Sequence, residues 1–169
     1  MADDSKPATP TGPLASLITE AQNGHLSVSF SPDVVVNADE FAYIERDCKA
    51  FKAELIKLQQ AAQYISDQEN WGLGEGEDRL ISAKTLVPRF RSKAAKVSPS
   101  DSDNNLVDIF KKHYQIVDDL QTLHHNIAQQ YCEQDAAFAA EYNRLMANMP
   151  ANPIGHPIQP GVGPGLGQS

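Results

Sequence analysis

The sequence has few of the features that mark enzymes, membrane proteins or disulfide-stabilised domains. Its 169 residues include only two cysteines, Cys48 and Cys132, which are far apart and both fall within expected helices. This spacing provides neither a disulfide framework nor a set of zinc ligands. No apolar run reaches the roughly 18 residues that a membrane-spanning helix requires, so we expect no membrane span. The net charge of −8 disfavours the phosphate backbone of a nucleic acid as a partner.

Catalytic motifs are also missing, because no Ser, Cys or Lys nucleophile stands beside a recognisable base. The glycine-rich stretch 72–76 is acidic and follows a helix, whereas a phosphate-binding loop follows a strand. His113, His124 and Asp135 recur at intervals of eleven residues along one helix face, with Cys132 nearby, which leaves a metal-binding helical protein as an alternative. Helical metal sites usually take ligands one turn apart or from facing helices. We therefore expect no enzyme activity, no cofactor and no metal.

Both ends of the chain read as disordered tails around one helical domain. Residues 1–13 are polar and contain three prolines, and they lack the basic start and apolar core of a secretory signal peptide. Residues 150–169 are rich in glycine and proline. Residues 14–149 remain as the helical domain.

Periodicity and capping signals divide that domain into four helices. We expect a short helix at 14–22, a helix at 32–69, a Trp/Gly turn at 70–76, a helix at 79–97 and a long helix at 104–148. Residues 25–30 alternate in polarity and are expected to form an apolar strap over the helices. The second helix has two possible starts, at Ser31-Pro32-Asp33 and at Asn37-Ala38-Asp39-Glu40. Pro88 should kink the helix that contains it or end a turn near Thr85.

Two of the helices carry a regular apolar seam. In each, large apolar residues recur in alternating steps of three and four, as in a coiled coil, and the positions between them are mostly polar. The candidate interaction seam comprises Phe41, Ile44, Phe51, Leu55, Leu58 and Ile65 of the first long helix and Leu106, Ile109, Ile116, Leu120, Leu123 and Ile127 of the last one. A lone helix cannot bury such a seam, so each needs a partner surface.

The resulting fold class is all-α: a helical hairpin, or a small elongated bundle with coiled-coil-like seams. Two antiparallel helices would leave part of both seams in water. Either the segment 79–97 fills the gap as a third helix or a second molecule does. The length of the seams favours a homodimer, or a heterodimer with a similar helical protein.

The stretch 70–76 holds the single tryptophan of the chain. Trp71 is followed by Gly72, Gly74 and Gly76, which permit positive φ angles and a sharp reversal. We expect the Trp71 ring to be buried between the two helices that the turn joins. Further along, Tyr131 and Asp135 lie one turn apart near the end of the last helix, as a compact patch that another protein could bind.

These features resemble the Trp-X-Gly (early-secretory-antigen-like) superfamily of actinobacterial type VII secretion substrates, of which this chain would be a larger, divergent member. In that family a Trp-X-Gly turn closes a helical hairpin, and a Tyr-X-X-X-Asp/Glu motif contributes to the export signal. Here Gly72 follows Trp71 directly, so the strict spacing is not kept. Tyr-X-X-X-Asp also occurs at Tyr43/Asp47 and Tyr114/Asp118, and position alone favours Tyr131/Asp135.

The resemblance implies a non-enzymatic protein that is exported by, or accessory to, a type VII-like secretion system and acts through helix–helix interactions. Its partners would be a similar helical protein and the secretion machinery. It would be cytoplasmic before export and secreted without a classical signal peptide. The alternative is a cytoplasmic helical adaptor or scaffold that binds a partner helix and has no part in secretion.

Overall fold

The structure, a computed structural model, describes residues 12–26, 36–101 and 104–152. Within these ranges the protein consists of helices and loops without strands, which confirms the all-α class. The five helices are α1 (Ala15–Gln22), α2 (Ala38–Asp67), α3 (Ile81–Ala94), α4 (Leu106–Gln134) and α5 (Ala136–Ala147). The two tails expected to be disordered lie almost wholly outside the described residues. So do most of the expected strap and the Ser31-Pro32-Asp33 start signal.

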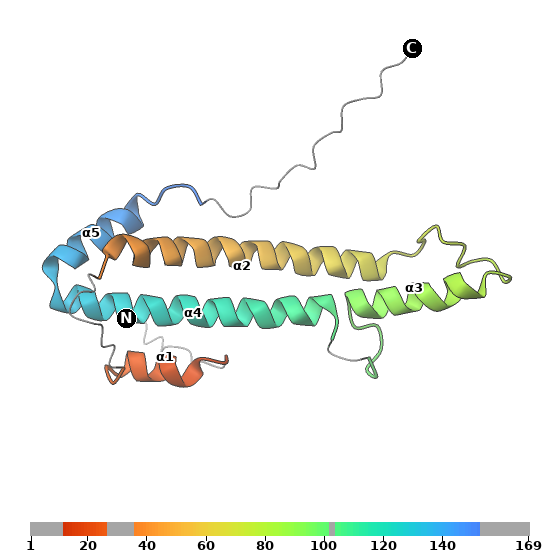
Figure 1. Ribbon diagram of the computed structural model, residues 1–169, viewed down its shortest axis with the longest axis horizontal. Helices are drawn as coiled ribbons and strands as arrows, with labels where there is room; N and C mark the ends of the chain where they lie inside the picture. The colour runs from red at the N-terminus through yellow and green to blue at the C-terminus, as the bar shows by residue number, and fades with distance from the viewer. Residues whose placement is uncertain (1–11, 27–35, 102–103, 153–169) are drawn as a thin grey trace, which may run out of the picture.

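The helices form an elongated hairpin (Figure 1). α2 is one arm, and α3 and α4 lie end to end along the other arm, running back in the opposite direction. The chain reverses at the tip of the hairpin, in the loop between α2 and α3. Segment 79–97 therefore continues the second arm instead of packing beside both arms as a third helix.

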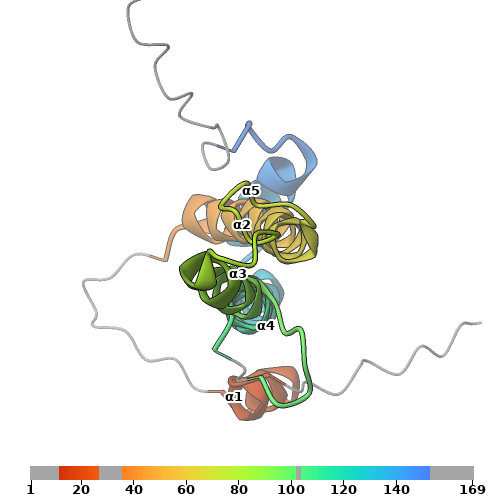
Figure 2. The same ribbon diagram turned by 90° about the vertical axis from the view of Figure 1, so that its right-hand side faces the viewer.

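Two short helices flank the open end of the hairpin. Viewed along its length, the molecule is a stack in which α5 lies over α2, and α1 lies on the far side of α4 (Figure 2). Two long-range hydrogen bonds fix α1: the Leu14 N–H donates to Asp119 Oδ2 at 2.8 Å, and Gln130 Nε2 donates to the Ala21 carbonyl at 2.7 Å. The buried carboxyl group of Asp119 is thereby paired.

α2 begins at the second of its two predicted start signals. Val36 and Asn37 are not helical, and the Asn37 side chain accepts a hydrogen bond from the Asp39 N–H at 3.0 Å. Asp39 and Glu40 place negative charge in the first turn, where the helix dipole favours it. A helix that includes 36 and 37 is therefore not observed, and α2 ends at Asp67, two residues before the predicted end.

The long helix expected at 104–148 is broken into α4 and α5. Asp135 adopts extended backbone angles of φ −132° and ψ 108°, and its side chain accepts hydrogen bonds from the N–H groups of Ala137 and Phe138. It thus closes α4 and caps α5. The single long helix that was predicted is therefore two helices that meet at Asp135.

α3 is shorter at both ends than the predicted helix 79–97. It runs through Pro88, which has no N–H to donate, without ending there. It stops at Ala94 after a basic last turn that contains Arg91 and Lys93.

Small side chains bring the two arms together. Ala42 of α2 and Ala128 of α4 are both fully buried, and they share a cluster with Phe138, Tyr142 and Leu145 of α5. Nearer the tip, Ala62 packs with Ala95 and Val107. Alanines at these positions let the helix backbones approach closely. Phe51 and Leu58 of the predicted seam, by contrast, remain 44% exposed.

Candidate protein-interaction site

Part of each predicted seam lies on one side of the hairpin and is open to solvent. We call this surface the apolar face and define it by Phe51, Leu58 and Ile65 of α2 and Leu106, Ile109, Ile116 and Leu120 of α4. Except for half-buried Ile109, these side chains are between 37% and 44% exposed. Phe51, Leu58 and Ile65 follow one another at seven-residue spacing, which keeps them in line along α2.

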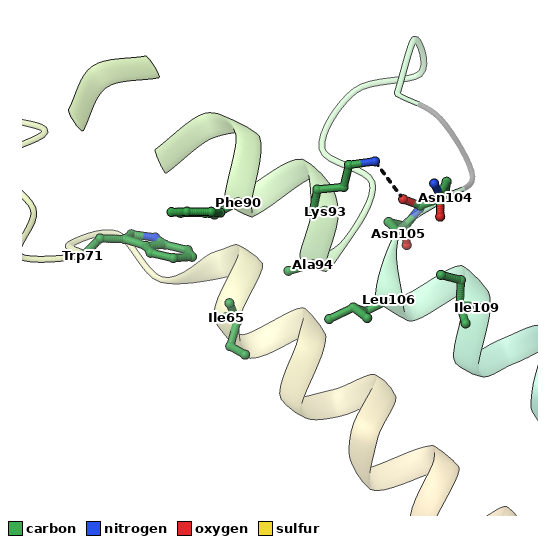
Figure 3. Close-up of a pocket in the computed structure, with 9 residues that line it drawn as sticks. All are labelled: Ile65, Trp71, Phe90, Lys93, Ala94, Asn104, Asn105, Leu106 and Ile109. Atoms are coloured by element: carbon green, nitrogen blue, oxygen red, sulfur yellow. Dashed lines mark hydrogen bonds between the residues drawn. The ribbon is translucent and has the colours of Figure 1, made fainter. Parts of the chain in front are cut away.

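A cavity at one end of the face shows that both arms contribute to the same side. Ile65 of α2 lines this cavity together with Leu106 and Ile109 of α4. It has a volume of about 590 Å³ and opens where α3 gives way to α4 (Figure 3). We call it the tip cavity; its remaining lining residues are Trp71, Phe90, Lys93, Ala94, Asn104 and Asn105.

The opposite side of the hairpin is polar and tied across the arms. Lys52 Nζ of α2 donates to Asp118 Oδ1 of α4 at 2.6 Å and lies 5.7 Å from the centre of the Tyr114 ring. Ile56 lies on this side, because it shares a pocket with Tyr114 and Lys111. The hairpin is thus amphipathic as a whole, with one face left apolar.

The other predicted seam residues are at least partly covered. Leu55 is buried, and Phe41, Ile44, Leu123 and Ile127 are half-buried. The Phe41 ring contacts the rings of Tyr131 and Phe138 at centroid distances of 6.0 and 5.8 Å. At the open end α5 covers the seam residue Phe41, whereas Phe51, Leu58 and Ile65 farther along α2 remain exposed.

The Trp/Gly turn is held by a single carboxylate. Gly72 and Gly74 have φ angles of 69° and 81°, which favour glycine. The Glu75 carboxylate accepts hydrogen bonds from the N–H groups of Trp71 and Leu73. These backbone hydrogen bonds lower the pKa of Glu75, and the hydrogen bond from Trp71 has the largest effect.

Trp71 is half-buried instead of fully buried as expected. Its ring stacks on Phe90 of α3 with centroids 5.9 Å apart, and its Nε1 donates to the Gln68 carbonyl at 3.1 Å. The ring ties the turn to α3 and leaves part of its surface to the tip cavity (Figure 3). It therefore belongs to the candidate site as well as to the fold.

Tyr131 and Asp135 are one turn apart, but the structure gives each a local role. Tyr131 is half-buried and packs against the Phe138 ring at a centroid distance of 5.4 Å. Asp135 is exposed and caps α5. The pair therefore sits at the break between α4 and α5, not within a continuous helix.

A buried polar cluster joins α2, α4 and α5, and the sequence reading missed it. Glu45 is only 4% exposed, although the seam pattern placed it among solvated positions. Its Oε1 accepts a hydrogen bond from the Tyr142 hydroxyl and lies 2.7 Å from His125 Nδ1. Burial, and then the hydrogen bond to Glu45, raise the pKa of Tyr142. A signal was available, because Glu45 falls at helical spacing from Ala38 and Ala42, both small residues of the buried stripe.

No group of three or more potential metal ligands occurs among the described residues. Cys48 and Cys132 are free thiols, and burial raises the pKa of each. His124 is half-buried against the Phe41 ring, and burial lowers its pKa. Phe41 and Cys132 both pack against the core cluster that contains Ala42 and Tyr142.

None of the helices in the described ranges is long and apolar enough to cross a membrane. Comparison with known proteins finds no matching family, no similar curated protein and no similar solved structure.

Proposed function

We propose that this protein is a non-enzymatic, protein-binding helical hairpin that docks its apolar face on the corresponding face of a second copy or of a similar helical protein. The exposed apolar face carries this proposal. Contiguous apolar patches of this kind mark interaction sites on proteins. The seven-residue spacing of the apolar face along α2 matches the heptad repeat of helices that pack in coiled coils and four-helix bundles.

The test compares two substitutions that differ in the side of the hairpin they affect. Leu58 lies on the apolar face and is 44% exposed, whereas Ile56 lies on the opposite side and is 43% exposed. Leu58→Glu should abolish association, because a partner would have to bury the new charge. Ile56→Glu introduces the same charge at equal exposure and should leave association intact.

Light scattering at about 50 µM protein reports the mass, because association depends on protomer concentration. A dimer in the wild type and in Ile56→Glu, with a monomer in Leu58→Glu, supports self-association. A strictly monomeric wild type would reject it and leave a different helical protein as the partner. Binding of that protein must then be lost in Leu58→Glu and kept in Ile56→Glu, or the proposal is wrong.

We further propose that the protein is a substrate or accessory of a type VII-like secretion system, cytoplasmic before export and secreted without a cleaved signal. Three features support this role. They are the hairpin shape, its closure at Trp71-Gly72, and the placement of Tyr131 and Asp135 near the end of the second arm.

The export test must separate the motif from the fold, because Asp135 caps α5 and the Tyr131 ring packs in the core. Tyr131→Phe keeps the ring, and Asp135→Asn keeps a capping oxygen. The double variant should therefore remain folded and lose export from the native host. Tyr64→Phe, at a side chain that is 74% exposed, is the control. Unchanged secretion of the folded double variant would show that the pair is no signal, and a protein confined to the cytoplasm would favour the adaptor role instead.

A further inference from the structure

α3, which follows the tip of the hairpin, is a basic element in an acidic protein. Residues 79–100 contain six Lys and Arg side chains and no Asp or Glu, whereas the whole chain has 14 of the former and 22 of the latter. This segment spans α3 and the start of the loop that follows it. Charge of one sign gathered on one element attracts a partner of opposite charge and steers its approach.

The tip cavity lies beside this basic segment and is mainly apolar. Its walls include the Trp71 and Phe90 rings, and Phe90 is 47% exposed. Lys93 lies at the cavity and donates to the Asn104 carbonyl oxygen at 3.3 Å (Figure 3). The volume of about 590 Å³ falls within the roughly 300–1,000 Å³ typical of ligand pockets. It can accept an aromatic side chain together with part of the backbone that carries it.

The basic side chains divide into those that hold the tip together and those beside the cavity. Arg91 Nη2 donates to the carbonyl oxygens of Gln68 and Glu69, and Lys84 pairs with Asp78. These contacts fix α3 against the turn. Lys93 is exposed and lines the cavity, whereas Arg89, one helical turn earlier, lines a separate pocket with Pro88 and Val97.

We propose that the tip cavity binds an acidic segment of the partner protein, with one bulky apolar side chain in the cavity and a carboxylate against Lys93. This inference rests on the proposed function, because Ile65, Leu106 and Ile109 belong both to the cavity and to the apolar face. A partner that covers the face continues directly into the cavity. Aromatic anchors in such pockets commonly dominate binding energy.

An anionic membrane surface fits the tip less well than an acidic peptide does. The turn carries Glu75, Glu77 and Asp78 close to the exposed apolar side chains of Leu73 and Ile81. Acids at these positions would be repelled by anionic lipids if the tip were inserted. A peptide can contact the cavity from the side of α3 and avoid them.

The experiment uses three synthetic peptides of about 14 residues, or four helical turns. The first has Glu on its polar positions and a central Phe among Leu seam residues, the second replaces every Glu by Gln, and the third replaces the Phe by Ala. None contains Trp, so the emission of Trp71 in the cavity reports binding to the full-length protein. The first peptide should bind at least about tenfold more tightly than the other two, and its affinity should fall as salt is added.

Variants of the protein locate the binding. Lys93→Glu should weaken the first peptide at least about tenfold through like-charge repulsion, whereas Lys111→Glu, on the opposite side of the hairpin, should not. Equal binding of the Glu and Gln peptides, or full binding to folded Lys93→Glu, would overturn the proposal. Leu58→Glu separates the two proposals, because it should lose association but keep peptide binding. If association is intact but no peptide binds, the tip-cavity proposal is rejected and the apolar-face proposal stands.

Discussion

Glu45 shows how much of this fold depends on single polar residues. Its carboxyl group is almost fully buried among α2, α4 and α5, accepts a hydrogen bond from the Tyr142 hydroxyl and lies 2.7 Å from His125 Nδ1. A buried polar group that loses its partner costs about 1–3 kcal/mol. The cluster therefore selects one arrangement of α5 against the hairpin, since a shifted α5 would leave Glu45 with fewer partners.

We expect Tyr142→Phe to lower the free energy of unfolding by about 1–3 kcal/mol at neutral pH, because the ring remains and Glu45 loses a donor. Burial and the hydrogen bond to Glu45 raise the pKa of Tyr142 above its ordinary 10.0. The unfolded chain therefore releases this proton at lower pH than the folded protein does. The stability that the neutral phenol contributes is complete below pH 10.0 and falls as the pH rises above it.

Urea unfolding at neutral pH and above pH 10.0 measures both effects. The gap in stability between the wild type and Tyr142→Phe should narrow at the higher pH. Tyr64→Phe, at a side chain that is 74% exposed, should change stability by less than about 0.5 kcal/mol at either pH. A Tyr142→Phe protein as stable as the wild type at neutral pH would contradict the role assigned to the cluster.

At the scale of the elements, the break at Asp135 decides where α5 lies. A continuous helix would carry Phe138, Tyr142 and Leu145 past the end of α2, whereas the break returns them to the cluster that contains Ala42.

Asp135→Ala removes the cap and should destabilise the protein by about 0.5–2 kcal/mol, and Asp135→Asn should cost much less. Hydrogen exchange should rise first in α5 in the Ala variant. Equal stability of the Ala and Asn variants would show that the side chain does not hold the break.

The elements themselves were largely predictable, because capping signals and apolar periodicity act locally. Asn37 belonged to one of the two predicted start signals of α2, and α4 begins at Leu106, two residues after its predicted start. The apolar periodicity could not predict whether a seam faces the other arm or the solvent, because that depends on how closely the two arms approach. Ala42 and Ala128 are buried because their small side chains let the two arms approach closely. Phe51 and Leu58 are too large for such a contact and remain exposed. The buried place of Glu45 was missed for the same reason, since its partners come from two other helices.

At the scale of the molecule, the position of the apolar face determines the shape of an assembly. The face runs along the arms from Phe51 and Leu120 to the tip cavity, and α2 alone, with 30 residues, is about 45 Å long at 1.5 Å per residue. Two molecules that bury this face must lie side by side. Contact through the tips alone would place them end to end and bury far less apolar surface.

Small-angle X-ray scattering distinguishes these arrangements in solution. If the wild type self-associates, its mass should double relative to Leu58→Glu while its maximum dimension increases by less than about a quarter, because the arms overlap along their length. Ile56→Glu should scatter like the wild type. A dimer nearly twice as long as the Leu58→Glu monomer would place the contact at the tip instead. The apolar face would then be left without the partner that its spacing requires.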